Sequence, residues 1–286
     1  MNEKSGKLYL VGTPIGNLGD ITYRAVKTLS EVDFICAEDT RVTLKLLNHL
    51  EIKKPLISYQ EHSAASVADL IVSRILAGEN AAEVTDAGMP CISDPGEKLV
   101  RACAAAGIEV DVIPGATAFS AAIALSGMNV SRFAFEGFLS VSKKQRAAHL
   151  ASLKNDTHTL IFYEAPHKLH ATLRDILSHF GNRNIAICRE LTKIHQEVIR
   201  TDLENAEKMF YERPRRGEFV IIIEGKAPAA VPEEITAEAA AKEAAELTEN
   251  GIKLSEACKI ISEKYNLKKS EIYAIVSQKK KMDNVI

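Results

Sequence analysis

The sequence predicts an α/β fold made of two α/β domains and a small helical appendage. Short apolar runs alternate with helical patterns over most of the chain, which is typical of strands covered by helices. The pattern changes register near residue 131, and the composition shifts to Ala, Glu and Lys after residue 226. We therefore expect an N-terminal α/β domain at residues 1–130, a C-terminal α/β domain at 131–226, and a linker with a helical tail at 227–286.

The N-terminal part contains a series of short apolar runs that we predict to be strands. These runs are "LYLVG", "VDFICAE", "PLIS", "NAAEVTD" and "IEVDVIPG". Helical patterns such as "ITYRAVKTLSEV" and "SVADLIVSRILAG" separate them. This order favours a largely parallel sheet, in which ligands bind at the carboxyl ends of the strands.

The C-terminal α/β part has apolar runs that alternate only partly, so we predict a mixed sheet there. The expected strands are "FAFEGF", "HTLIFYE", "NIAICRE" and "GEFVIIIEG". The expected helices are "KKQRAAHLASLK", "HKLHATLRDILSHF" and "LENAEKMFYER". After the predicted linker "APAAVP" we expect two or three helices, with Gly251 marking the end of the first.

Composition places the chain among ordinary globular proteins. Hydrophobic residues make up 46% and charged residues 26% of the 286 positions, and the formal net charge is −2. This charge does not argue for a nucleic-acid partner, although local patches matter more than the total. We expect no membrane span and no signal peptide. The five cysteines are widely spaced and odd in number, so we expect no disulfide, no metal site and a cytoplasmic location.

Three unusual loops follow predicted strands. The loop "GTPIGN" has the spacing Gly-x-x-x-Gly, which matches neither a Walker loop nor the dinucleotide fingerprint. An acidic residue, Glu38, lies 22 positions beyond Gly16, and this leaves a nicotinamide-dependent dehydrogenase open as a weak alternative. The loop "IPGATA" precedes a helix of small residues, which suits either a ligand or close helix–sheet packing.

The loop "TDAGMPCISDPG" returns twice to Asp and Gly. We expect Asp94 to cap the following helix, with Pro95 in its first turn. A cap explains Asp94 but not the long loop around it. Two tight turns expose backbone N–H and C=O groups, which can bind a neutral or zwitterionic ligand.

Polar side chains gather at the predicted strand ends. The segments that carry them are "AEDTR", "YEAPHK" and "CRELTK". One interpretation is an ion-paired scaffold with helix caps, and the other is a binding site for a polar substrate. Both remain open at the level of the residues alone.

Seven motifs then occur in an order that is informative as a set. They are "LYLVGTPIGNLGDIT", "AEDTR", "DAGMPCISDPG", "IPGATA", "FEGFL", "FYEAPHK" and "RELTK". Over about Lys7 to Gly225 the chain closely resembles the ribosomal RNA small-subunit methyltransferase I family, a branch of the tetrapyrrole methylase superfamily. Departures are small: Gly12 stands where alanine is common, Glu83 interrupts a usually more apolar strand, and Lys168 replaces a frequent arginine.

The resemblance implies a methyltransferase that uses S-adenosylmethionine and holds it in a cleft between two α/β domains, without a Rossmann site. The implied reaction is methylation of the ribose 2′-hydroxyl of a cytidine in 16S rRNA of the small ribosomal subunit, by a homodimer. The idea that Glu38 binds a dinucleotide ribose is then dropped. The implied cofactor contacts are Pro14, Gly16, Asp86, Ala87, Gly88, Met89, Ile92, Thr117, Ala118, Phe162, Tyr163 and Leu191.

Methyl transfer to an alcohol is an in-line displacement, which needs alignment and benefits from a base, because a protonated hydroxyl is a poor nucleophile. The candidate bases or orienting acids are Glu38, Asp39, Glu164 and Glu190. The candidate RNA contacts are Arg41, His167, Arg189 and Lys193, supported by basic runs at 143–146, 213–216 and 279–281. The alternatives are a methylase of a tetrapyrrole carbon or small molecule, and a non-catalytic ribosome-assembly factor.

Overall fold

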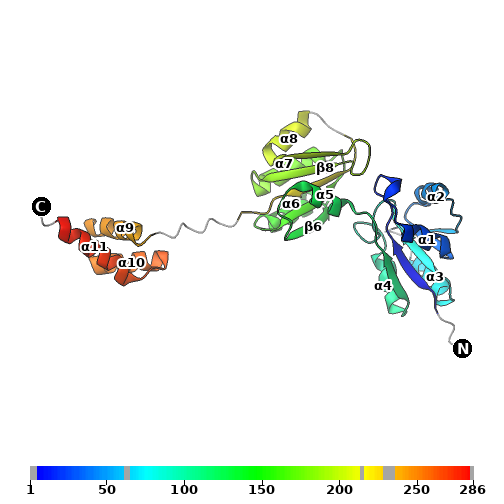
Figure 1. Ribbon diagram of the computed structural model, residues 1–286, viewed down its shortest axis with the longest axis horizontal. Coiled ribbons are helices and arrows are strands. Elements are labelled where there is room, and N and C mark those ends of the chain that lie inside the picture. The colour runs from blue at the N-terminus through cyan, green and yellow to red at the C-terminus, as the bar shows by residue number, and fades with distance from the viewer. Residues whose placement is uncertain (1–4, 61–64, 213–215, 228–235, 284–286) are drawn as a thin grey trace. The chain divides into compact units, whose positions relative to one another are not determined.

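The computed structural model describes residues 5–60, 65–212, 216–227 and 236–283, with the side chains of the last helix described up to residue 278. The chain divides into two compact units, Met1–Lys226 and Ala227–Ile286. The first unit contains two sheets, and the elements in the described part of the second are helices (Figure 1).

The first sheet is parallel throughout, with strand order β3-β2-β4-β1-β5. Its strands are β1 (Lys7–Val11), β2 (Phe34–Ala37), β3 (Leu56–Ser58), β4 (Ala81–Val84) and β5 (Glu109–Ile113). Its helices are η1 (Leu18–Asp20), α1 (Tyr23–Glu31), α2 (Thr40–His49), α3 (Ala65–Leu76) and α4 (Glu97–Ala105). All five predicted strands and the parallel arrangement are confirmed.

Apolar residues bury both faces of this sheet. Val11 and Ile35 lie in a cluster on one face, and Leu8 and Phe34 lie in a second cluster on the other. Strands that are covered on both sides read as continuous apolar runs, as "FICA" does in β2. Because all strands point the same way, the loops that follow them meet at a single edge.

The second sheet is mixed, with strand order β6-β7-β10-β8-β9. Strand β6 is parallel to β7, and the other neighbours are antiparallel. The strands are β6 (Phe133–Phe138), β7 (Thr159–Glu164), β8 (Asn184–Arg189), β9 (Glu197–Asp202) and β10 (Phe219–Ile223). The helices are α5 (Ala118–Ser126), α6 (Lys143–Leu153), α7 (Leu169–Phe180) and α8 (Leu203–Glu212). Strand β9 is additional to the four predicted, because its sequence "EVIRTD" is too polar to stand out.

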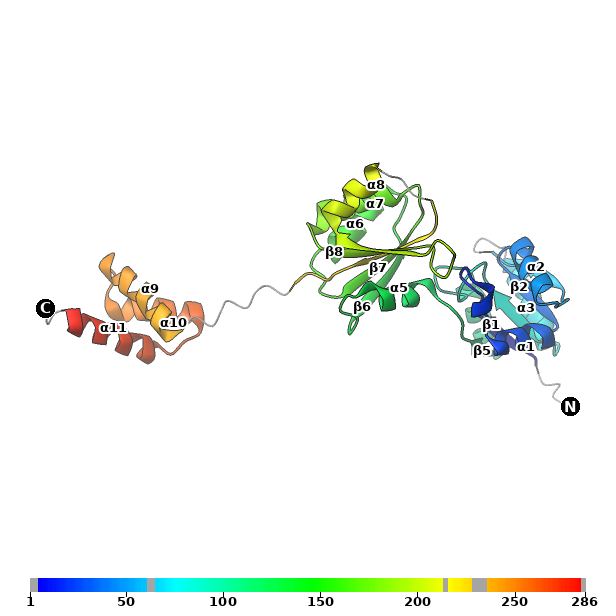
Figure 2. The same ribbon diagram turned by 45° about the horizontal axis from the view of Figure 1, so that its top comes forward.

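Helices cover the two faces of this sheet unequally. One face packs against α6, α7 and α8 around residues such as Phe162 and Leu173. Helix α5 covers the other face (Figure 2) and packs with Ile161 and Val220. Although α5 precedes residue 131, it belongs to the packing of the second sheet and not of the first.

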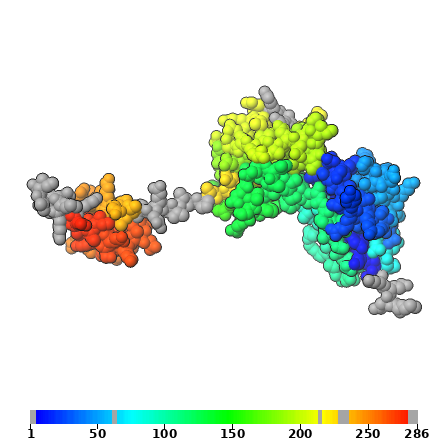
Figure 3. All heavy atoms as spheres, in the orientation of Figure 1, coloured from blue at the N-terminus to red at the C-terminus, as the bar shows by residue number. Residues whose placement is uncertain are grey.

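The helical tail consists of α9 (Ala237–Glu249), α10 (Leu254–Tyr265) and α11 (Lys269–Asp283), drawn in orange and red in Figure 3. Small and branched side chains such as Ala240, Cys258 and Ile272 form a core of its own. Gly251 lies between α9 and α10 at a φ of 92°, as its predicted role requires. The predicted linker "APAAVP" lies, after Ala227, outside the described residues.

Among the described residues, no helix is both long and apolar enough to cross a membrane. All five cysteines are free.

Candidate active site

The loops after β1, β4 and β5 meet at the carboxyl edge of the first sheet. The backbones of Thr13 and Gly88 exchange two hydrogen bonds, of 2.8 Å and 3.2 Å. Gly12 and Gly115 come so close that a Cβ on Gly12 would lie 2.7 Å from the Gly115 nitrogen. This close approach accounts for the two glycines, and it gathers the three unusual loops in one place.

A pocket of about 360 Å³ lies between this edge and the strand ends of the second sheet. That volume is within the range of small-molecule sites, and most of its wall is apolar. From the first-sheet side and α5 it is lined by Ile15, Glu38, Asp86, Ala87, Gly88, Met89, Ile92, Ser93, Asp94, Thr117 and Ala118. From the second-sheet side it is lined by Phe138, Tyr163, Glu164, Ala165, Pro166, Leu191, Glu218, Phe219 and Val220.

Two apolar side chains reach the pocket from strained loops. Ile92 lies between Cys91 and Ser93, whose φ angles are 68° and 63°. Leu191 lies between Glu190 and Thr192, whose φ angles are 51° and 63°. Residues other than glycine rarely adopt this left-handed conformation, and such strain gathers at functional sites. The two loops thus present matching apolar side chains to one cavity.

The expectation that Asp94 caps the following helix is wrong. Helix α4 begins at Glu97, its N-cap is Gly96 at a φ of 137°, and no side chain makes a capping hydrogen bond. The turn through Pro95 and Gly96 moves the N-cap position two residues downstream of Asp94. The Asp94 side chain consequently contributes to the pocket wall.

Acidic side chains line the first-sheet side of the pocket. The Glu38 carboxylate accepts hydrogen bonds from the Thr85 hydroxyl at 2.6 Å and from the Asp86 N–H at 3.2 Å. Burial and the neighbouring Glu38 raise the pKa of Asp86, and the same causes raise the pKa of Asp94 to about 7. Within the described residues, no group of His, Cys, Asp and Glu has an arrangement suited to a metal ion.

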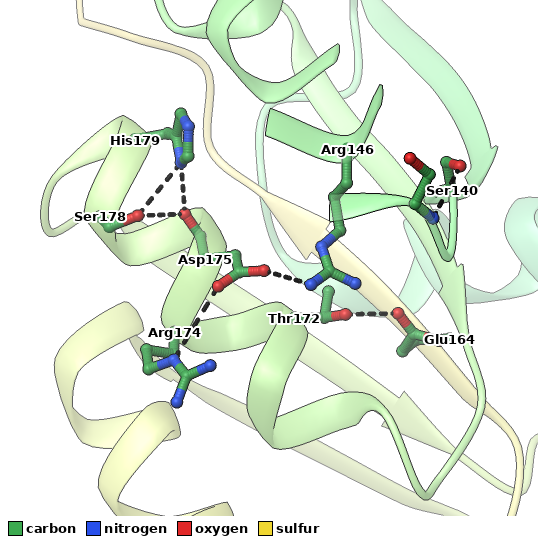
Figure 4. Close-up of polar contacts among 9 residues, drawn as sticks. Ser140, Arg146, Glu164, Thr172, Arg174, Asp175, Ser178 and His179 are labelled. Carbon is green, nitrogen blue, oxygen red and sulfur yellow. Dashed lines mark hydrogen bonds and ion pairs between the residues drawn. The ribbon is translucent and has the colours of Figure 1, made fainter. Parts of the chain in front are cut away.

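Glu164, on the second-sheet side, is buried and fully engaged. Its carboxylate accepts from the Thr172 hydroxyl at 2.6 Å (Figure 4) and from the Ala165 N–H at 2.8 Å. Farther along α7, Asp175 pairs with Arg146 at 2.6 Å, so Arg146 of the basic run 143–146 is already neutralised. Glu164 therefore lines the pocket but has both of its oxygen atoms committed to the fold.

Glu190 lies beside the pocket and does not line it. Its carboxylate accepts from the Glu218 N–H at 2.9 Å and from Lys193 Nζ at 3.0 Å. Burial alone would raise its pKa, but these two contacts outweigh burial and lower the pKa of Glu190. Lys193 also pairs with Glu218 at 2.9 Å, so both predicted side chains form one ion-paired cluster.

Asp39 is the N-cap of α2 and takes no part in the pocket wall. Its carboxylate accepts from the Arg41 N–H at 2.8 Å and pairs with the Arg41 guanidinium at 2.5 Å. These contacts hold the pKa of Asp39 well below its usual range. The Arg41 side chain is 86% exposed, so it remains accessible while it is paired.

The other two predicted RNA contacts also lie outside the pocket. Arg189 donates to the Arg216 carbonyl oxygen at 2.6 Å and lies 3.8 Å from Glu197. His167 is exposed at the surface, just after Pro166. Of the basic run 213–216, only Arg216 is among the described residues, and the side chains of 279–281 lie outside the description.

Nine of the twelve cofactor contacts expected from the resemblance line the pocket. The three that do not are Pro14, Gly16 and Phe162. Gly16 packs against Leu191 and Lys193, and Phe162 is buried in the core below α7. The pocket residues that sequence reasoning missed are Ile15, Ser93, Asp94, Phe138, Ala165, Pro166, Glu218, Phe219 and Val220. Strand alternation separates two of the expected contacts, because Phe162 and Tyr163 are consecutive on β7 and point to opposite faces, and of these two Tyr163 lines the pocket.

Known proteins resemble the chain over most of its length. Residues 7–207 match the family model of Tetrapyrrole (Corrin/Porphyrin) Methylases. The "Ribosomal RNA small subunit methyltransferase I" of Synechocystis sp. is 45% identical over 271 residues, which are 94% of this chain and 97% of the relative. The protein of the same name from Thermotoga maritima is 49% identical over 221 residues, 77% of this chain and 99% of that one.

Solved structures share the fold at lower identity. The methyltransferase CobJ aligns with a TM-score of 0.60 at 20% identity, over 79% of this chain and 97% of its own. Uroporphyrin-III C-methyl transferase from Thermus thermophilus, solved with S-adenyl homocysteine, aligns with a TM-score of 0.54 at 19% identity. The alignment covers 77% of this chain and 98% of that protein. The predicted class of two α/β sheets with a helical appendage is confirmed. On its sequence and its fold together, the chain belongs to the ribosomal RNA small subunit methyltransferase I family of tetrapyrrole methylases.

Proposed function

We propose that this protein transfers a methyl group from S-adenosylmethionine to the ribose 2′-hydroxyl of a cytidine in small-subunit rRNA. The observation that carries the proposal is the pocket itself, which unites nine of the twelve cofactor contacts expected for this family. The close relatives named for small-subunit rRNA support the choice of substrate over a tetrapyrrole or another small molecule.

The residues present fit the cofactor. Met89, Ile92 and Leu191 offer an apolar surface, and the turns around Gly88 offer backbone groups. Helix α5 begins in the wall at Thr117 and Ala118, where the Ala118 N–H can donate to a polar ligand, while the Phe119 N–H donates to the Tyr163 hydroxyl at 3.0 Å. When bound, S-adenosylmethionine supplies an electrophilic methyl group on a sulfonium, and the chain's task is to align a hydroxyl with it.

We assign RNA contacts by what each predicted side chain already binds. Arg41 and His167 are exposed at the strand-end surface and are proposed to contact phosphates or bases. Arg189 and Lys193 are held in contacts within the chain and are proposed to position the loop that carries Leu191. We also propose a homodimer in the cytoplasm, and sedimentation equilibrium measures the assembly.

The direct test is methylation of the proposed substrate. Undermethylated small ribosomal subunits are incubated with tritiated S-adenosylmethionine and the protein, and the labelled site is mapped by nuclease protection and nucleoside analysis. Label on a cytidine 2′-oxygen supports the proposal. Cofactor binding without any transfer to small subunits contradicts it and favours a non-catalytic assembly factor.

A matched pair of variants ties the activity to the pocket. Ala118→Phe fills the cavity at the start of α5, and Ala124→Phe adds the same side chain on the exposed face of that helix. We expect at least a tenfold loss of S-adenosylhomocysteine affinity in Ala118→Phe, which corresponds to about 1.4 kcal/mol, and none in Ala124→Phe. Equal affinities in both variants, measured by calorimetry, would place the cofactor elsewhere.

A further inference from the structure

Strand β6 contains an irregularity close to the pocket. Its pairing with β7 is regular up to Phe135, skips Glu136 and resumes at Gly137. The extra residue forms a β-bulge, which is rare between parallel strands, and Gly137 adopts a φ of 63° there. Because a bulge re-aims the side chains that follow it, the side chain of Phe138 changes face.

Because of the bulge, Phe138 lies on the same face of the sheet as Phe135. Their register partners on β7 are Tyr163 and Ile161, which pack on the α5 face. The residue between these partners, Phe162, belongs to the core beneath α6, α7 and α8. With strict alternation from Phe135, residue 138 would point into that core. The bulge instead directs Phe138 into the pocket wall.

Phe138 is the exposed end of a row of four aromatic rings. The row runs from Phe119 through Phe135 and Tyr163 to Phe138, with successive centroids 4.8, 4.9 and 5.5 Å apart. It is fixed at its other end, because the Phe119 N–H donates to the Tyr163 hydroxyl at 3.0 Å. Phe138 packs edge-on against Tyr163 and is still 57% exposed. The row therefore presents a rigid apolar ring to a ligand.

The proposed reaction restricts where the base of the target nucleotide lies. The ribose 2′-hydroxyl must enter the pocket to reach the methyl group, and the base is attached to the neighbouring carbon of the same sugar. A base that leaves its RNA stack is commonly stacked on an aromatic side chain of the protein. Of the three described aromatic residues in the pocket wall, Phe219 is buried, Tyr163 is half-buried and Phe138 is exposed.

From this arrangement we propose that the base of the target cytidine stacks on the ring of Phe138 while its ribose 2′-hydroxyl lies in the pocket. The inference deepens the proposed function and rests on it. Stacking tolerates every base, because all bases have a π-face. Phe138 therefore holds and orients the nucleotide, and it does not select cytosine over other bases. The adenine of the cofactor has a π-face as well, so the test must tell the two ligands apart.

The first test compares Phe138→Leu with Phe133→Leu. Phe133 lies on the same strand, is 44% exposed and is not part of the pocket wall, so it is the matched control. For Phe138→Leu we expect kcat/KM for small subunits to fall about tenfold, because the π-face is lost. Its S-adenosylhomocysteine affinity and melting temperature should stay at the wild-type values. Phe138→Tyr keeps the ring and is expected to retain wild-type kcat/KM, as is Phe133→Leu.

A readout without turnover locates the base directly. Ultraviolet light joins a pyrimidine to an aromatic side chain on which it stacks. Complexes of the protein, S-adenosylhomocysteine and undermethylated small subunits are irradiated and digested with trypsin and nuclease. Fragmentation of peptide 133–143 by mass spectrometry is expected to place a cytidine on Phe138. The cross-link should be lost in Phe138→Leu and kept in Phe133→Leu.

Four outcomes overturn the inference. They are an unchanged kcat/KM in Phe138→Leu, an equal loss in Phe133→Leu, a cross-link on Phe133 in place of Phe138, and a loss of S-adenosylhomocysteine affinity in Phe138→Leu. The last of these assigns the ring to the adenine of the cofactor. A wild type that transfers no methyl group to small subunits overturns the proposed function itself. An active wild type with an unaffected Phe138→Leu overturns the stacking alone.

Discussion

The two sheets of the first unit place acidic residues at similar positions and treat them differently. At the end of β7, Glu164 is satisfied by Thr172 and Ala165, and beyond β8, Glu190 is satisfied by Lys193 and the Glu218 N–H. At the first sheet, Asp86 and Asp94 are held near Glu38, and their pKa values rise. The second sheet therefore uses these two acids to hold the fold, whereas the first sheet keeps Asp86 and Asp94 beside a third carboxylate, Glu38, in the pocket wall.

The core of the first sheet also contains an acid without a partner in the described part of the chain, unlike Glu164 and Glu190 of the second sheet. Glu83 lies in the middle of β4, is 2% exposed, and has no hydrogen-bond partner for either carboxyl oxygen among the described residues. Burial raises the pKa of Glu83 to about 8, so the side chain is a neutral acid at pH 7. An ideal Cβ on Gly96 would lie 2.6 Å from its Oε1, which places Glu83 directly beneath the loop that carries Asp94.

The largest expected effect follows from this buried acid. Folded Glu83 keeps a proton that the unfolded chain releases above its ordinary pKa of 4.5. The folded state therefore binds more protons between about pH 4.5 and 8, and its stability falls as the pH rises through that window. We expect the wild type to lose on the order of 3 kcal/mol between pH 5 and 8 from this group alone.

Urea unfolding of Glu83→Gln and of the wild type at several pH values measures this pH-dependent loss of stability. The variant is expected not to show the loss, so its free energy of unfolding rises relative to that of the wild type as the pH increases. Parallel curves would show that Glu83 is ionised in the fold, and would break the contrast between the two sheets.

The next effect concerns the satisfied acid of the second sheet. Glu164→Ala leaves the buried Thr172 hydroxyl and the partly buried Ala165 N–H without their acceptor, which is expected to lower the free energy of unfolding by about 2 kcal/mol. Thr172→Val in the same background should then add little, because the two groups act as a pair. Urea denaturation of the two single variants and the double variant measures this, and additive losses would contradict the pairing.

A smaller effect is expected at Gly16, where the two sides of the pocket touch. A Cβ there would lie 2.5 Å from Lys193 Cγ and 2.9 Å from the Leu191 carbonyl oxygen. Gly16→Ala must displace the Leu191 loop, so we expect a several-fold loss of S-adenosylhomocysteine affinity, of order 1 kcal/mol. Gly19→Ala, in the exposed part of the same loop, is the control, and calorimetry that finds the two variants alike would exclude this contact as a determinant of binding.

The smallest change in stability is expected at Arg41, whose ion pair with Asp39 is exposed. Arg41→Gln should leave the melting temperature unchanged and raise KM for small subunits, with a weaker dependence of binding on salt. Arg101→Gln removes an arginine from another exposed pair, with Glu97, and serves as the control. Equal KM values in both variants would remove Arg41 from the RNA surface.

Much of this molecule follows from local patterns. Strand β2 is a continuous apolar run, and the segment "AEDTR" contains the N-cap of α2 at Asp39. The start of α4 could not be read in this way, because an Asp-Pro pair is a good cap in isolation. The positive φ angles of Cys91, Ser93 and Gly96 instead bend the chain away before the helix begins.

The sequence by itself determined the fold class, the family and the loops that surround the pocket, because strand patterns and ordered motifs are local properties of the chain. Tertiary structure decided which partners each acid has. Lys193 and Glu218 are 25 residues apart in the sequence, and Glu38 and Thr85 are 47 apart. Each pair forms its hydrogen bond only once the sheets have formed. Since the state of a carboxyl group depends on the partners and the burial that surround it, the roles of Asp94, Glu83 and Glu164 could be assigned only in the folded protein.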